Sequence, residues 1–124
     1  MLDNHLKALY KELGMSVSPE KGKDKSYPIE LAADAKMFVS ELFPGMRFFA
    51  KLGPLPEEEQ EERLIKYMRA NFIGQGTGET RLGLDAAGKN VTLTMHNPED
   101  ISYSRFKEAV EEFANFVDYW KGEL

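Results

Sequence analysis

The chain has 124 residues, the usual length of one domain, so we expect a single domain over residues 1–124. Its 16 Lys and Arg residues against 21 Asp and Glu residues give a formal net charge of -5, which argues against a nucleic-acid partner. The absence of cysteine excludes disulfides and thiolate metal sites and suits a reducing compartment. Without a signal-peptide pattern or an apolar run near the ~20 residues of a membrane span, the sequence predicts a soluble cytoplasmic protein with no membrane insertion.

The N-terminal third has one helical pattern and one weak strand pattern. Four leucines at steps of four, three and four residues predict an amphipathic helix that ends at Gly14, namely Leu2, Leu6, Leu9 and Leu13. Residues 15–25 are rich in Ser, Pro, Gly, Lys and Glu, and we expect a mobile surface loop there. Residues 27–31 are expected to form a short edge strand, because Pro28 has no N–H to donate to a sheet ladder.

A β-hairpin is the next predicted element. Two strands with alternating apolar and polar residues are expected at 36–42 and 46–52, joined by a proline–glycine turn. The apolar side chains of the second strand share a predicted inner face, made up of Met46, Phe48, Ala50 and Leu52. Phe49 is the exception, because it alternates to the opposite face between Arg47 and Lys51.

The middle of the chain predicts a second helix and a second hairpin. A proline followed by acids at 56–59 suits the start of a helix, whose positive dipole end favours negative charge. Its broad apolar stripe ends near Gly74 and consists of Leu64, Ile65, Tyr67, Met68 and Phe72. Glycine-rich residues 74–78 then lead into expected strands at 80–84 and 91–95.

The last helix has the clearest pattern of all. After a cap at Ser102, apolar residues recur at steps of four, three, four and three, namely Phe106, Val110, Phe113, Val117 and Trp120. The predicted order is therefore a helix, two or three strands, a helix, two strands and a final helix. This order indicates an α+β domain in which three helices accompany an antiparallel sheet.

No group of side chains has the spacing of a catalytic or metal site. His5 and His96 lack further ligands at a suitable spacing and are interpreted as ordinary surface residues. Consecutive acids at the start of the second helix point around its axis, so a solvated face is favoured for Glu57, Glu58, Glu59, Glu61 and Glu62. The serines show no nucleophile elbow. We therefore predict no catalytic residue, no metal, no cofactor and no enzymatic activity.

The glycine-rich connector at residues 74–78 is the feature that most invites a nucleotide-binding interpretation. A phosphate loop needs a strand before the glycines and a helix after them, so that backbone N–H groups face the phosphate. In this chain the predicted helix comes first and the strand follows, and the Lys-Ser/Thr pair of a Walker motif is missing. A flexible linker is favoured, and a small enzyme that binds a phosphate ligand is the less favoured alternative.

Aromatic residues are numerous for a domain of this size, and most fall on predicted core faces. Phe43, Phe49 and Phe116 lie off those faces. They can therefore contribute an exposed apolar patch of the kind that marks a protein-binding surface.

A series of short segments and single residues lies between about residues 37 and 120: Leu52-Gly53-Pro54-Leu55-Pro56, Leu64, Met68, Asn71-Phe72, Leu82-Gly83-Leu84-Asp85, Gly88, Val91-Thr92-Leu93, Phe106, Phe113 and Trp120. Taken together, the series resembles the class I type III secretion chaperones of the Tir-chaperone-like kind. The leucine helix at the N-terminus fits the same family. The resemblance implies the α-β-β-β-α-β-β-α order that the periodicities also predict.

The resemblance further implies a cytoplasmic, dimeric chaperone from a Gram-negative bacterium that holds the N-terminal region of a secreted effector or secretion-apparatus protein. Such a protein gives pockets to apolar side chains and a sheet edge to an added strand. The expected substrate contacts, on the first helix and the sheet, are Leu6, Leu9, Phe38, Phe48 and Phe49. The expected dimer contacts, on the second helix, are Leu64, Ile65, Tyr67, Met68 and Phe72. The dimer can be a homodimer or a heterodimer with a related chaperone, and a same-fold interaction or regulatory module outside secretion is the main alternative.

Overall fold

The computed structural model describes residues 2–13, 26–32, 35–71 and 80–124. In chain order these ranges contain α1 (Leu2–Glu12), β1 (Ser26–Ala32), β2 (Ala35–Glu41), β3 (Met46–Pro54), α2 (Gln60–Asn71), β4 (Thr80–Leu84), β5 (Asn90–Asn97) and α3 (Tyr103–Gly122). The predicted α+β class and the order α-β-β-β-α-β-β-α are confirmed. The loop expected at 15–25 and the connector at 74–78 lie outside the described residues.

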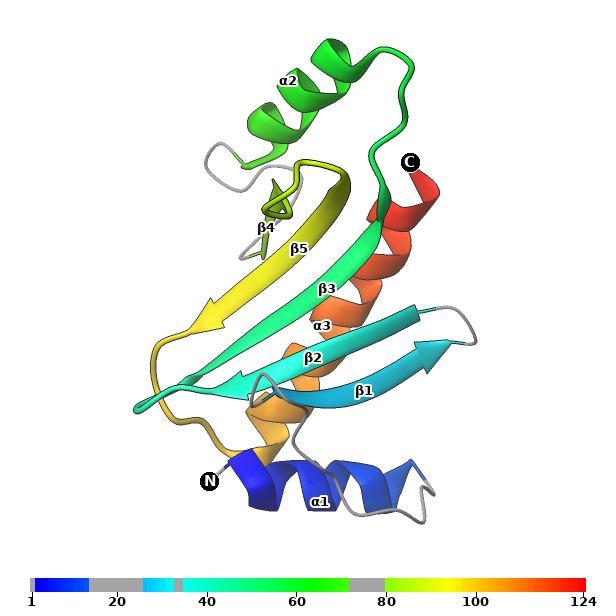
Figure 1. Cartoon of the computed structure of the whole chain (residues 1–124). Helices are drawn as coiled ribbons and strands as arrows, with labels where there is room; N and C mark the ends of the chain where they lie inside the picture. The colour runs from blue at the N-terminus through cyan, green and yellow to red at the C-terminus, as the bar shows by residue number, and fades with distance from the viewer. Residues whose placement is uncertain (1, 14–25, 33–34, 72–79) are drawn as a thin grey trace.

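The strands form one five-stranded antiparallel sheet in the order β1-β2-β3-β5-β4. β3 is therefore central, and β1 and β4 are the edges. Figure 1 shows α3 running behind the sheet, with α1 below it and α2 above it in this view. We call the face covered by α3 the inner face and the opposite face the outer face.

Alternation along the strands decides which side chains reach the inner face. In β3 the predicted inner set is fully buried and consists of Met46, Phe48, Ala50 and Leu52. The ring centroid of Phe48 lies 6.2 Å from that of Phe106 and 5.8 Å from that of Phe113, both on α3. α3 begins after the predicted cap, because the Ser102 hydroxyl accepts a hydrogen bond from the Arg105 N–H.

α1 packs on the α3 side of the sheet and ends earlier than predicted. Leu2, Leu6 and Leu9 are buried, but the helix ends at Glu12 and the Leu13 side chain is 55% exposed, so Leu13 is not part of the buried stripe. His5 is half-buried: its Nε2 donates a hydrogen bond to the Ile101 carbonyl (2.7 Å), and its ring stacks on Phe106. The interpretation of His5 as an ordinary surface residue is therefore wrong.

α2 lies beside the C-terminal end of α3. It begins at Gln60 rather than at the predicted acids, because Glu59 has a φ of 55°, a left-handed conformation that does not continue a helix. The acids at residues 57–62 are exposed, as a solvated face requires. On the opposite side of the helix Tyr67 is buried and meets Trp120 edge-on, with ring centroids 6.0 Å apart.

At both sheet edges, side chains already bind backbone groups that an added strand would use. At β4, the Asn71 amide donates to the Leu82 carbonyl (2.8 Å) and accepts from the Leu82 N–H (2.9 Å), so it replaces a neighbouring strand there. At β1, Pro28 has no N–H, and its carbonyl accepts a hydrogen bond from the Tyr10 hydroxyl. A strand added at either edge would have to displace or avoid these contacts.

Replacing Asn71 tests the β4 edge. Asn71→Ala removes both hydrogen bonds to Leu82, and we expect the free energy of unfolding in urea to fall by about 1–3 kcal/mol. Hydrogen exchange of the Leu82 amide should accelerate. The matched control, Asn115→Ala on the exposed face of α3, should stay within about 0.5 kcal/mol of the original chain. Unchanged exchange at Leu82 would show that Asn71 does not protect this edge.

Candidate protein-binding surfaces

The outer face of the sheet presents a row of residues that crosses all five strands. The strand register aligns Pro28, Phe38, Phe49, Thr94 and Arg81 in this order from β1 to β4. Phe38 and Phe49 are direct cross-strand partners, both half-buried, and neither belongs to the core or packs against it. They therefore form an aromatic pair on the side of the sheet opposite α3.

The five predicted substrate contacts are divided between this face and the core. Leu6, Leu9 and Phe48 are buried, because α1 turns its leucines towards α3 and the sheet and β3 turns Phe48 inward. Leu6 and Phe48 are core residues, so their expected place on a binding surface is corrected, whereas Leu9 is buried but also lines the groove described next. Phe38 and Phe49 are the members of the predicted set that face outward.

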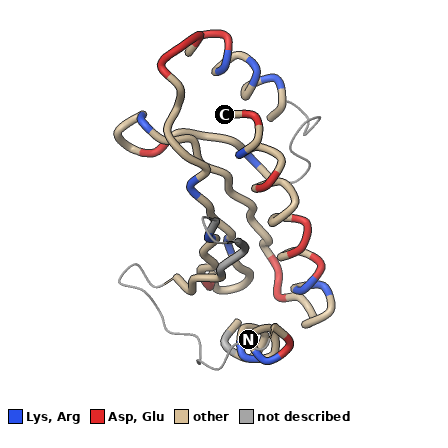
Figure 2. Tube along the Cα trace, turned by 90° about the vertical axis from the view of Figure 1, so that its right-hand side faces the viewer, with Lys and Arg blue, Asp and Glu red and all other residues tan. Residues whose placement is uncertain are grey.

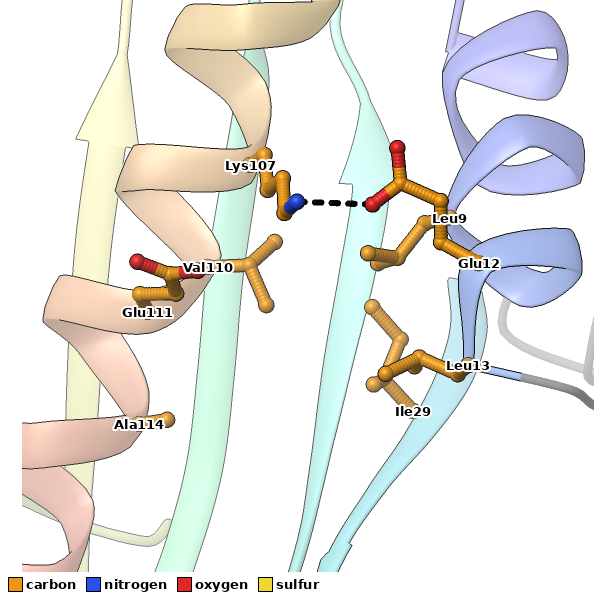
Figure 3. A pocket seen from close by; sticks show the side chains of 8 residues that line it. All are labelled: Leu9, Glu12, Leu13, Ile29, Lys107, Val110, Glu111 and Ala114. Carbon is orange, nitrogen blue, oxygen red and sulfur yellow. Dashed lines mark ion pairs between the residues drawn. The ribbon is translucent and has the colours of Figure 1, made fainter.

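A groove of about 360 Å³ lies between the C-terminal end of α1, α3 and β1. Figure 3 shows its apolar residues, which are Leu9, Leu13, Ile29, Val110 and Ala114, and its charged residues, which are Glu12, Lys107 and Glu111. The sequence patterns do not identify this groove, because its lining comes from three elements whose contacts no single periodicity specifies. The residue that points to this groove is Leu13, an apolar side chain that is exposed to solvent at the end of α1.

An ion pair spans the groove. The Lys107 Nζ lies 2.7 Å from a Glu12 carboxylate oxygen (Figure 3). The hydrogen bond from Lys107 lowers the pKa of Glu12, and the same bond raises the pKa of Lys107. Because both side chains are almost half exposed, solvent screens the attraction, and the pair orients the two helices more than it stabilises them.

The apolar stripe of α2 divides between two sides of the helix. Tyr67 is buried, and Leu64 is partly buried where it packs against the core. Ile65 and Met68 point away from the core and are 42% and 71% exposed. Phe72 lies outside the described residues. The outward half of the stripe is thus a second apolar surface.

The other two aromatics expected on the surface have different environments. Phe43, in the turn between β2 and β3, is 89% exposed, as predicted. Phe116 instead packs against the core from α3, so its expected place in an exposed patch is wrong: the apolar stripe of α3 is wider than its five most regular positions.

Within the described ranges, no cluster of three His, Cys, Asp or Glu side chains could hold a metal ion. No helix in the same ranges combines the length and the apolar character needed to cross a membrane. The glycine connector considered for a phosphate ligand is outside these ranges, so that alternative stays a prediction.

No family model matches this chain. A comparison with known protein sequences finds a relative that aligns over the full length of the chain. The protein CPj0713/CpB0740 of Chlamydia pneumoniae is 29% identical over 126 residues, which cover 100% of this chain and 96% of the relative.

Comparison with solved structures shows the fold. The Yersinia pestis type III secretion chaperone SycH, in complex with a stable fragment of YscM2, superposes with a TM-score of 0.70 at 16% identity, over 96% of this chain and 98% of the other. A chain of the HopA1–SchA chaperone–effector complex superposes with a TM-score of 0.73 at 13% identity, over 98% of this chain and 93% of the other. This chain has the fold of the type III secretion chaperones.

Proposed function

We propose that this chain is a cytoplasmic type III secretion chaperone that binds the N-terminal region of a secreted protein and keeps it in a non-globular form. The observation that carries the proposal is the aromatic pair of Phe38 and Phe49, which lies outside the core on the outer face of a chaperone fold. SycH and the matched chain of the HopA1–SchA complex share the fold, and each is in a complex with another protein.

A chaperone that holds an unfolded segment needs a surface of this kind. A segment that stays unfolded offers separate apolar side chains rather than a preformed complementary surface. The cross-strand pair of Phe38 and Phe49 gives such side chains an aromatic contact, and the groove between α1 and α3 gives a second apolar position. Because both sheet edges are occupied near their middle, side-chain contacts carry more of this binding than strand addition does.

A charge placed in the aromatic pair tests the substrate surface. Phe49→Asp should weaken binding of the co-purified partner about thirtyfold, equivalent to about 2 kcal/mol, because a central apolar anchor is lost. Titration calorimetry measures the affinity. The melting temperature should change little, since Phe49 is not packed against the core.

The matched control is Phe43→Asp, which places the same charge on an exposed phenylalanine in the turn after β2 and should leave the affinity unchanged. Equal binding by Phe49→Asp and the original chain would exclude the outer face as the substrate surface. Unfolding of Phe49→Asp would instead mean that the strand faces are assigned the wrong way round.

We also propose that the chain forms a dimer through the outward face of α2. Ile65 and Met68 are exposed on a helix whose other side contacts α3 through Tyr67 and β4 through Asn71. Large apolar side chains adjacent on a helix surface are typical of an interface with a second subunit. The partner subunit can be a second copy of this chain or a related chaperone.

A double substitution tests the dimer. Ile65→Asp combined with Met68→Asp should convert a dimer to a monomer in light scattering at micromolar concentration, because two desolvated carboxylates would face the partner. The conservative pair Ile65→Leu and Met68→Leu should remain dimeric. A monomeric original chain, purified without any partner, would contradict a homodimer and leave the heterodimer.

A further inference from the structure

The charges of this acidic chain are distributed unevenly between its two sides. The solvent side of α3 has exposed carboxylates, which are Glu108, Glu111, Glu112 and Asp118. On the outer face of the sheet, β3 instead exposes Arg47 and Lys51. Figure 2 shows this separation, with acidic positions along α3 and basic positions on the sheet. The outer face is therefore locally basic although the chain has a net charge of -5.

The two cations bracket the aromatic pair. Arg47, Phe49 and Lys51 alternate onto the same face of β3, so each cation is two residues, or roughly 7 Å, from Phe49 along the strand. Their register neighbours on β5 are His96, Thr94 and Thr92. The outer-face band, defined by Phe38, Arg47, Phe49 and Lys51, thus places an apolar centre between two positive charges.

Arg47 and Lys51 take part in none of the ion pairs found within the described ranges. Those pairs join Lys66 to Glu123, Arg105 to Glu108 and Lys107 to Glu12. Glu30 of β1 has an outer-face register position, directly opposite Lys36 of β2. Asp85, in the turn after β4, has a pKa lowered first by a hydrogen bond from Asn90 and least by the charge of Lys51. The positive potential of the band therefore remains available to a partner.

We propose that the outer-face band selects a partner segment that is acidic as well as apolar. The inference rests on the proposed function and adds the chemistry of the segment. An extended peptide places residues i, i+2 and i+4 about 7 Å apart on one side, the spacing of Arg47, Phe49 and Lys51. The matching ligand pattern is a carboxylate, any residue, a large apolar residue, any residue and a second carboxylate.

Charge also orients the partner. An acidic segment is repelled by the carboxylates along α3 and attracted by the band, so the field of the chaperone directs the segment to the outer face. Charged contacts at the margin of an interface chiefly raise the rate of association and the specificity, while the apolar centre supplies affinity. Salt should therefore weaken the selectivity for acidic segments.

Two synthetic peptides of about 12 residues test this chemistry, one with the sequence pattern Glu-Ser-Phe-Ser-Glu at its centre and a twin with Lys in place of each Glu. Fluorescence anisotropy measures the affinity of the full chain for each. We expect the acidic peptide to bind about tenfold or more tightly than its twin, and the difference to shrink between about 50 mM and about 500 mM salt. Equal affinities, or no binding of either peptide, would overturn the inference.

Charge-reversal variants test whether the selectivity for the acidic peptide comes from the outer-face band. Arg47→Glu with Lys51→Glu should weaken the acidic peptide about tenfold or more and strengthen its basic twin, whereas Lys7→Glu, on the exposed side of α1, should change neither. Arg47 and Lys51 are both exposed, so these substitutions should not disturb the core. Lys51→Glu alone is a milder variant that should also weaken the acidic peptide and strengthen its basic twin. Dissociation of an oligomer by these variants would identify a second copy as the occupant and overturn the inference.

The co-purified partner separates this inference from the proposed function. Loss of the partner in Phe49→Asp but not in the charge-reversed variant would leave the chaperone function standing and remove the acidic selectivity. Absence of any bound partner or peptide in the original chain would contradict the function itself.

Discussion

Phe48 of β3 packs against Phe106 and Phe113 of α3, and this contact determines which side of the sheet is available for binding. Burying each of these rings contributes about 1.5–3 kcal/mol of hydrophobic free energy. With Phe48 turned inward, alternation turns Phe49 outward, where it meets Phe38 across the strands. The core and the candidate binding surface are thus two consequences of the same strand register.

The two smaller helices extend this arrangement without covering the outer face. α1 joins the α3 side through the stacking of His5 on Phe106 and the ion pair of Glu12 with Lys107. α2 joins the far end of α3 through Tyr67 and meets β4 through an amide side chain. The described helices therefore leave one sheet face, one groove and one helix face for other proteins.

Periodicity within single elements predicted a large part of this fold. The alternation in β3 and the stripe of α3 placed the inner face correctly, because each records which side of one element is apolar. The sequence could not show which neighbour covers an apolar side. Leu6 and Leu9 were expected at a binding surface for this reason, and the stripe of α2 could not be divided between the core and solvent.

Contacts between distant segments could not be predicted either, because a periodicity describes one element and not its neighbours. The amide of Asn71 at the β4 edge depends on α2 and β4 lying side by side, and the left-handed φ of Glu59 depends on how the chain enters α2. The groove between α1 and α3 needs three elements in place. In contrast, the outward position of Phe49 between two cations follows from the period of a strand, and it is this feature that connects the sequence to the proposed chemistry.

The proposed function depends most on a partner binding at the outer face of the sheet. Hydroxyl-radical footprinting of the complex with its co-purified partner, read by mass spectrometry, measures this for each aromatic side chain. If the partner covers the outer face, oxidation of Phe38 and Phe49 falls on binding, while oxidation of the exposed Phe43 does not change. Unchanged oxidation of Phe38 and Phe49 in a saturated complex, with protection confined to other surfaces, would contradict binding at the outer face.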